Sequence, residues 1–326
     1  ATMDLSSLDG SNGFRLDGVA RRDFSGRSVS SAGDVNGDGY DDVIVGAFNA
    51  DPNGLNSGSS YVVFGMASGF SATMDLSSLN GSNGFRLDGV AGDLSGWSVS
   101  NAGDVNGDGF DDLIVGASRA DMNGADSGSS YVVFGKASGF SAAMNLSSLD
   151  GSNGFRLDGV SEDDFTGNSV SNAGDVNGDG FDDLIVGASR ADMNGADSGS
   201  SYVVFGKASG FSATMNLYSL DGSNGFRLDG VSEDDYTGGS VSSAGDVNGD
   251  GFDDLIVRAS GADPNGEESG SSYIIFGRSD FSDVDFPGTD GDDELTGTEA
   301  AESFEAGAGN DKMIGRGGAD VFYGEA

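Results

Sequence analysis

Short apolar runs recur along the chain between clusters of glycine, asparagine and aspartate, and none of them follows the period of an amphipathic helix. This pattern predicts an all-β protein. Within the first 70 residues it predicts four strands, at about residues 14–19, 28–32, 42–47 and 60–65.

The predicted strands differ in how their side chains alternate. The runs Val43 to Val45 and Tyr61 to Phe64 are continuously apolar, which is typical of strands covered on both faces. The segment Phe14 to Asp17 alternates, as an outer strand with one wet face does. The segment Ser28 to Ala32 consists almost wholly of small side chains, which suits a strand crowded near a central axis.

This pattern repeats every 70 to 71 residues. The phrase Phe-Arg-Leu-Asp-Gly begins at Phe14, Phe85, Phe155 and Phe226. A four-stranded sheet covered on both faces needs neighbours on both sides, and tandem copies supply them. Radial stacking of such sheets is a β-propeller, so we expect a propeller over residues 1–280, with repeats at about 1–70, 71–140, 141–211 and 212–280.

The order of the strands favours a ring closed within one chain. The chain opens on an outer-strand segment at Phe14, and the fourth repeat ends at Gly277 without a following copy. We therefore expect the first segment to complete the last blade. The alternatives are an open array and the association of two chains into a larger ring, because four blades is the minimum of the usual range.

Composition narrows the classes of partner. The 326 residues include 54 acidic and 15 basic side chains, for a formal charge of −39. This balance argues against nucleic acid or an anionic membrane as partner and favours cations or neutral polymers. The chain has no Cys and no His, so it lacks disulfides and the commonest general base, and no apolar stretch is long enough to span a membrane.

Each repeat also carries the pattern Asp-x-Asn-x-Asp-Gly-x-Asp-Asp. Oxygen ligands at alternate positions, with glycine at the sixth for a sharp turn, let a short loop wrap a cation of calcium's size. Mg²⁺ tolerates such all-protein cages poorly. The predicted ligands are four side chains and the seventh-position backbone carbonyl of each loop: Asp34, Asn36, Asp38, Tyr40 and Asp42; Asp104, Asn106, Asp108, Phe110 and Asp112; Asp175, Asn177, Asp179, Phe181 and Asp183; Asp246, Asn248, Asp250, Phe252 and Asp254.

The loop is not an EF-hand, because position twelve is Val45 where a helix-loop-helix site has a bidentate Glu, and a strand follows it. A solvated acidic turn is the alternative for any single copy. Four complete copies favour a metal site.

These repeats resemble the FG-GAP repeats of integrin α-subunit propellers. The matching segments are Asp23 to Val29, Asp34 to Asp42, Val45 to Phe48 and Tyr61 to Phe64, with their later copies up to about residue 278. The resemblance implies calcium in the loop between the first two strands of a blade and ligand binding on the opposite face. The chain departs from the seven-bladed family in having four repeats, and Arg258 replaces the glycine of the other three copies.

From about Asp280 a repeat with a period of nine residues replaces the longer repeat, and we expect a second domain over residues 281–326. It resembles the RTX, or haemolysin-type, nonapeptide repeat, with frames that start at Gly288, Gly297, Ala306 and Gly315. This resemblance implies a short parallel β-roll that binds further Ca²⁺ ions, with Asp293, Asp311 and Asp320 as ligands, and bacterial type I export. A flexible Gly/Asp linker is the alternative.

Differences between the repeats mark a candidate ligand face. They gather between the outer strand and the next inner strand, where the candidate residues are Arg21, Arg22, Arg27 and Trp97. By analogy with integrins these loops lie opposite the calcium loops. Ordinary packing is the alternative for Trp97, and for the repeated Arg15 a local ion pair with Asp17 is favoured over a site for polyanions.

We therefore predict a secreted or cell-surface calcium-binding protein of adhesion or recognition, with about four Ca²⁺ in the propeller and an extracellular protein or polysaccharide as ligand. The competing hypothesis is a polysaccharide lyase or hydrolase on a propeller scaffold. The pair Asp41 and Asp42 has the chemistry for acid and base, but it recurs four times within metal loops, whereas an enzyme normally has one site.

Overall fold

The structure is a computed structural model that describes residues 2–137 and 139–281, together with five short strand segments at 286–287, 294–296, 303–305, 312–314 and 321–323. The chain divides into two compact units. The larger comprises residues 1–220 and 225–279, and the smaller comprises residues 221–224 and 280–326.

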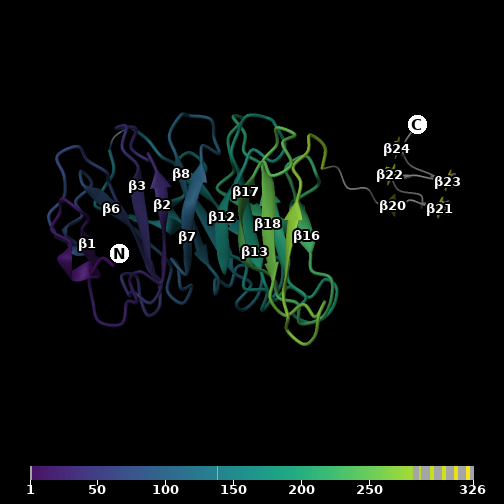
Figure 1. Ribbon diagram of the computed structural model, residues 1–326, viewed down its shortest axis with the longest axis horizontal. Helices are drawn as coiled ribbons and strands as arrows, with labels where there is room; N and C mark the ends of the chain where they lie inside the picture. Colours follow the sequence, from purple (N-terminus) through teal and green to yellow (C-terminus); the bar gives the residue numbers. More distant parts are fainter. Residues whose placement is uncertain are drawn as a thin grey trace. The chain divides into compact units, whose positions relative to one another are not determined.

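Blades 1 to 3 of the larger unit each combine three strands of one repeat with the outer strand of the next repeat, whereas blade 4 has three strands among the described residues (Figure 1). Blade 1 contains β2 (Ser28–Gly33), β3 (Asp42–Ala47), β4 (Ser59–Val63) and β6 (Gly84–Asp88). Blade 2 contains β7 (Ser98–Gly103), β8 (Asp112–Ala117), β9 (Ser129–Val133) and β11 (Gly154–Asp158). Blade 3 contains β12 (Ser169–Gly174), β13 (Asp183–Ala188), β14 (Ser200–Val204) and β16 (Gly225–Asp229). Blade 4 contains β17 (Thr237–Gly245), β18 (Asp254–Ala259) and β19 (Ser271–Ile275).

The predicted strands of the first repeat all form, and the structure has two further kinds of element that the pattern did not predict. Short strands pair in parallel with outer strands: β5 (Thr73–Asp75) with β1 (Arg15–Asp17), β10 (Ala143–Asn145) with β6, and β15 (Thr214–Asn216) with β11. One-turn 3₁₀ helices open the repeats: η1 (Leu5–Ser7), η2 (Leu76–Ser78), η3 (Leu146–Ser148) and η4 (Leu217–Ser219). Asp4, at the N-cap of η1, accepts a hydrogen bond from Ser6 N at 2.9 Å.

The expected wet face of the outer strand is mostly covered. On β6, Phe85 and Leu87 are buried, but Asp88 is buried as well and Arg86 is half-buried. Arg86 and Asp88 pair with each other along the strand, which satisfies both charges where water is excluded.

The expectation that the first segment completes the last blade is wrong. β1 pairs with β5, and among the described residues β19 pairs only with β18. Leu16 of β1 packs against the first blade beside Tyr61 and Val63, which holds β1 at that end of the row. Figure 1 shows β1 and β18 at opposite ends of the blades, so this structure has the open array.

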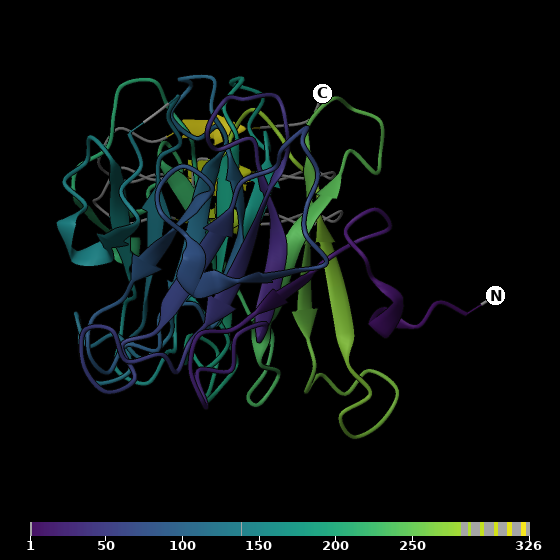
Figure 2. The ribbon, with the colours of Figure 1, turned by 90° about the vertical axis from the view of Figure 1, so that its left-hand side faces the viewer.

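Successive blades lie behind one another when the row is viewed from its first blade (Figure 2). The inner strands touch, since Val99 N donates to Ser28 Oγ of the preceding blade at 3.0 Å, and the next two pairs repeat this bond at 3.1 Å. Apolar cores fill the spaces between blades, where Phe85 and Leu87 of blade 1 pack with Tyr131 of blade 2. The continuously apolar runs on β8, β9, β13 and β14 are buried as predicted, and Ile44 and Val132 are fully inaccessible. The prediction is wrong for Val43, which is 37% exposed, and for β19, where Ile274 is 45% exposed.

The smaller unit has the parallel pairing of a β-roll. β20 (Phe286–Pro287), β22 (Ser303–Glu305) and β24 (Val321–Tyr323) form one sheet, and β21 (Glu294–Thr296) and β23 (Lys312–Ile314) form another. In register, Phe304 lies beside Phe286 and Phe322, and Leu295 lies beside Met313. Alternate nine-residue frames therefore supply alternate sheets.

Candidate functional site

The loop between β2 and β3 forms a tight turn in which the predicted ligand side chains accept hydrogen bonds from the loop's own backbone. Asp38 N donates to Asp34 Oδ1 at 3.0 Å and to Asn36 Oδ1 at 2.9 Å, so these two oxygens converge on one amide. Asp34 Oδ2 accepts from Gly39 N, and Asp38 Oδ1 accepts from Tyr40 N. Gly39 has a φ of 87°, a conformation that favours glycine.

The last aspartate of the motif has a different environment. Asp42 is fully buried, and its two carboxylate oxygens accept from Gly65 N at 2.8 Å and Val35 N at 3.2 Å. Burial raises the pKa of Asp42 to about 7, although these two hydrogen bonds act in the opposite direction. The equivalent Asp112 and Asp183 have the same cause of shift and pKa values of about 8.

Asp42 is therefore an anchor that joins the loop to the end of β4. The sequence predicted it only as a ligand. A carboxylate oxygen that accepts one N–H keeps a lone pair, so this structural role is compatible with the predicted coordination.

The loop donors fit a hard cation in their chemistry, because every predicted donor is an oxygen and none is nitrogen or sulfur. A divalent charge would also favour the ionised form of a buried carboxylate such as Asp42. Across the parts of the chain that the structure describes, no three acidic side chains form a metal-binding cluster, since the loop carboxylates instead bond to backbone amides. The ligand set remains a prediction.

All four loops repeat this arrangement. In loops two to four the first aspartate also accepts from the amide of the fourth position, and the asparagine side chain donates to the fifth-position aspartate. The predicted ligands Asp104, Asn106 and Asp108 have the same partners as their counterparts in the first loop.

A connection between neighbouring loops was missed by the sequence. Asp111, the residue before the buried Asp112, accepts from Asp34 N of the preceding blade at 2.7 Å. Asp182 and Asp253 repeat this bond to Asp104 N at 2.8 Å and Asp175 N at 3.0 Å. The paired aspartates thus have separate roles, one within its blade and one between blades. The repeated Asp-Asp pair was the available signal.

The predicted β-roll ligands Asp293, Asp311 and Asp320 lie outside the described residues.

The candidate ligand residues lie at the other end of the strands, because they precede β2 and β7 while the metal loops follow them. The Arg27 guanidinium lies 4.7 Å from the centre of the Trp97 ring, and Phe48 meets that ring edge-on at 4.9 Å. Trp97 is half-buried, so it has both a packing surface and an accessible one. Arg21 and Arg22 precede this pair in the sequence and are exposed.

The same end has further contacts between cations and rings. Arg119 and Arg190 lie 5.9 and 5.0 Å from the centre of the Phe165 ring. We name Arg27, Trp97, Arg119, Arg190 and Phe165 the arginine–aromatic face. The sequence had indicated only its first two members.

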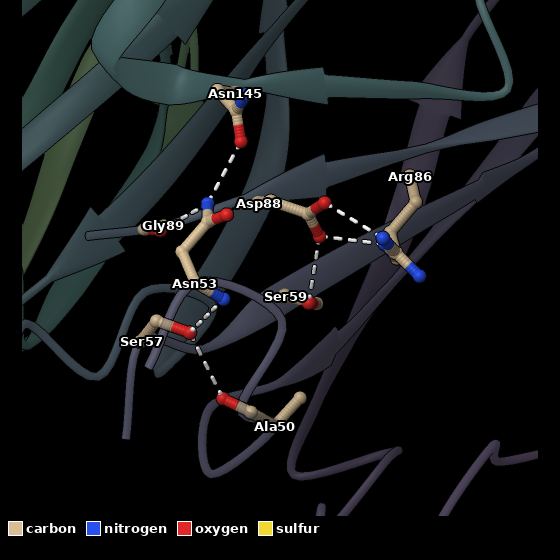
Figure 3. A network of polar contacts seen from close by, with 8 residues as sticks. All are labelled: Ala50, Asn53, Ser57, Ser59, Arg86, Asp88, Gly89 and Asn145. Carbon is tan, nitrogen blue, oxygen red and sulfur yellow. Dashed lines mark hydrogen bonds and ion pairs between the residues drawn. The ribbon is translucent and has the colours of Figure 1, made fainter. Parts of the chain in front are cut away.

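The remaining repeated polar residues have structural roles, as the sequence favoured. Arg15 pairs with Asp17 at 2.7 Å, and the three later copies form the same ion pair. The turn Asp51-Pro52-Asn53-Gly54 and its later copies also have a structural role. Asn53 Nδ2 donates to Gly89 O and to Asn145 Oδ1, as Figure 3 shows.

Comparison with known proteins identifies the repeats. The model of the FG-GAP repeat matches residues 25–63, 95–133, 166–204 and 237–275, and each match begins just before or at the start of an inner strand and ends on the third strand of its blade. The chain carries four FG-GAP repeats. The RTX calcium-binding nonapeptide repeat matches residues 296–326. The propeller blades of FG-GAP type and the RTX region are therefore as the sequence indicated.

The FG-GAP repeats are similar to integrin α subunits. The chain is 32% identical over 234 residues to Integrin alpha pat-2 of Caenorhabditis elegans, which covers 68% of this chain and 16% of that protein. It is 27% identical over 253 residues to Integrin alpha-5 of Xenopus laevis, covering 74% of this chain and 22% of that protein. The chain therefore spans about a fifth or less of the length of these relatives. Among the residues described, no helix has the length and apolar character needed to cross a membrane.

Both kinds of repeat support Ca²⁺ binding.

Proposed function

We propose that this chain is a secreted calcium-binding recognition protein in which Ca²⁺ rigidifies one end of the blades and the opposite end binds a ligand. About four ions bind the propeller loops and further ions bind the β-roll. The observation that carries the proposal is the loop that occurs four times with its oxygen donors and buried anchor, joined to the next blade in the first three copies. Because neighbouring loops are joined, order imposed on one loop limits the movement of the next.

The ligand is an extracellular protein or a polysaccharide, bound at the arginine–aromatic face. Trp97 offers a ring that stacks on a sugar or an aromatic side chain, and Arg27 beside it offers donors to a carboxylate. In a chain with a net charge of −39, several arginines at one end of the blades favour an acidic group on the ligand.

We propose binding without catalysis. The paired aspartates that offer acid–base chemistry hold backbone amides within and between blades, and they recur in every repeat. The alternative, a polysaccharide lyase or hydrolase, makes a different prediction for the same assay.

The test is to pass the protein in Ca²⁺ over immobilised matrix proteins and over neutral and acidic polysaccharides. We expect saturable retention on one class, without release of oligosaccharides. Trp97→Ala should weaken retention at least about tenfold, as loss of an aromatic anchor does. Lys136→Ala is the matched control, because it removes a cation 4.9 Å from the Phe140 ring at the metal-loop end. Cleavage of a polysaccharide, or equal losses in both variants, would contradict the proposal.

Localisation and assembly complete the proposal. The RTX region favours type I export, which predicts recovery of the protein in the medium of cells that carry such a system and retention in cells that lack it. We also expect self-association into a larger ring through the two end blades.

A further inference from the structure

The outer strand of one repeat pairs with the third strand of the preceding repeat at three places, which we call the internal joints: β6 with β4, β11 with β9 and β16 with β14. The three internal joints have the same contacts. At the first joint β6 pairs antiparallel with β4, with Arg86 opposite Tyr61. Figure 3 shows its side-chain bonds: Asn53 Nδ2 donates to Gly89 O at 2.9 Å, and Ser59 Oγ donates to Asp88 Oδ1 at 3.0 Å. The next two joints repeat both bonds, from Asn123 to Gly159, Asn194 to Gly230, Ser129 to Asp158 and Ser200 to Asp229.

The last blade has equivalent residues on its third strand, and among the described residues no fourth strand lies beside it. Tyr61, Tyr131 and Tyr202 are at most 3% exposed, whereas their counterpart Tyr273 on β19 is 36% exposed. Ile274 is 45% exposed in place of the fully buried Val62, Val132 and Val203. Within the part of the chain that the structure describes, β19 is therefore an unpaired sheet edge with apolar side chains, which is a template for another strand.

A cavity of about 180 Å³ lies beside this edge, lined among others by Leu228, Tyr273 and Ile275. The same positions in blade 1 are Leu16, Tyr61 and Val63, and there they pack around Leu76 of η2. Leu76, Leu146 and Leu217 are each 1% exposed. In the first three blades, a leucine from the 3₁₀ helix of the next repeat thus fills the space that corresponds to this cavity.

Residues 2–18 contain a leucine and an outer-strand sequence equivalent to those that complete the first three blades. Leu5 of η1 has the position of Leu76 in its repeat and is 78% exposed. The segment Gly13–Asp17 has the sequence of the outer strands, and in the described ranges β1 pairs on one edge only, with β5. Its second edge is the one by which β6, β11 and β16 join the preceding blade.

Charges that occur only at the two ends also match. At the second internal joint, Asp163 N and Phe165 N donate to the carbonyls of Ala125 and Asp126, so these two loops touch. The corresponding loops at the two ends of the row carry Arg21-Arg22 and Glu267-Glu268. Like charges or neutral residues meet at the internal joints, whereas opposite charges would meet only where blade 4 contacts the start of a chain.

We propose that residues 2–18 of one copy of this chain dock on blade 4 of a second copy. Gly13–Asp17 pairs antiparallel with β19, Arg15 opposite Tyr273, and Leu5 fills the cavity. The opposite ends of the row keep β1 from its own β19, which is why the partner is another copy. The proposal rests on the self-association proposed above, for which it names the contact, and it is independent of the ligand and of Ca²⁺-dependent recognition.

Arg258 makes this joint weaker than the internal ones. At internal joints Gly46, Gly116 and Gly187 lie so close to a backbone carbonyl of the next blade that a side chain would overlap it. Arg258 has that position in blade 4, so the faces of two copies pack less closely while the strand edges remain free to pair. We therefore expect reversible association, which Arg258→Gly strengthens.

Sedimentation of the full chain in Ca²⁺ tests the proposal. We expect a mass that rises with concentration from one chain to two or more, and Leu5→Asp should raise the dissociation constant at least about tenfold by placing a charge in an apolar cavity. Met122→Asp is the control, since this residue is an exposed apolar side chain on a turn, and it should leave the mass unchanged. A mass of one chain at all concentrations, or equal effects of both variants, would overturn the proposal.

Charge reversal tests the partner's identity. Arg21→Glu with Arg22→Glu should weaken association, Glu267→Arg with Glu268→Arg should weaken it equally, and all four changes together should restore it. Failure of the fourfold variant to recover would contradict the pairing.

A disulfide separates two copies from one closed ring, because the natural chain has no cysteine. Asp17→Cys with Ser271→Cys places thiols where the internal joints have the Ser–Asp bond. Oxidation should give a product of at least twice the chain mass on a non-reducing gel. A linked product of one chain's mass would show closure within the chain and overturn the proposal.

Discussion

The four repeats have nearly the same sequence at the metal-loop end of their blades and different sequences at the opposite end. At the metal-loop end all four repeats have the same Asp-x-Asn-x-Asp-Gly pattern, and the carboxylate of Asp111 or its copy binds the preceding loop. At the opposite end, Arg27 of the first repeat is replaced by Trp97, Asn168 and Gly239 in the later ones. Identical ends can stack in register, and variable ends can present a different surface on each blade. The comparison assigns stability to the first end and recognition to the second.

The largest loss of stability should come from a buried anchor at the metal-loop end. Asp183→Ala leaves Val176 N and Gly206 N without their carboxylate. We expect the free energy of unfolding to fall by at least about 3 kcal/mol, because two buried donors lose a charged acceptor. Urea unfolding in saturating Ca²⁺ measures this. A loss below about 1 kcal/mol would show that the anchor contributes little.

The bond between blades should contribute less. Asp182→Ala removes the acceptor of Asp104 N, and we expect a loss of about 1.5 to 3 kcal/mol, typical of a hydrogen bond to a charged group. Asp41→Ala is the matched control, because the described residues include no blade before it to which it could bind. Equal unfolding midpoints for the two variants would refute a role in stacking.

A buried carboxylate at the variable end should make stability depend on pH. Burial raises the pKa of Asp164 to about 6, above the value of about 3.9 in an unfolded chain. The folded state therefore holds this proton more tightly, and the stabilisation is complete below pH 4 and is lost as the pH rises through 6. Asp164→Asn should be more stable than the natural protein by about 1 kcal/mol at pH 7, after a reduction for solvent screening, and equally stable at pH 4. A constant difference between unfolding curves at the two pH values would contradict this.

The smallest effect on stability should come from the arginine–aromatic face. Arg27→Ala removes one exposed cation–ring contact, so we expect a loss of no more than about 1 kcal/mol by thermal unfolding. Ligand retention should nevertheless fall in this variant. A large loss of stability with unchanged ligand retention would show that Arg27 stabilises the fold and does not bind the ligand.

Repetition explains what could be predicted from the sequence. The strands, the metal-loop pattern and the Arg15–Asp17 ion pair are local, and four copies distinguish them from chance. The contact of Asp111 with Asp34 joins residues 77 positions apart, and the repeated Asp-Asp pair does not indicate which residue of another blade it contacts.

The prediction that the first strand of the chain closes the ring of blades was wrong for a related physical reason. Strand order indicates which edges are complementary, but the position of β1 depends on the pairing of three residues with β5 and on the burial of Leu16. The arginine–aromatic face was found only in part, because Phe165 comes beside Arg119 and Arg190 through the fold.

Calcium dependence of unfolding tests the central claim most directly. At 10 mM Ca²⁺, loops with dissociation constants of ~10⁻⁴ to 10⁻³ M each add about 1.5 to 3 kcal/mol to the free energy of unfolding. Melting should therefore fall by at least about 10 °C when the ion is replaced by excess chelator. The same melting temperature with Ca²⁺ and with chelator would contradict the account.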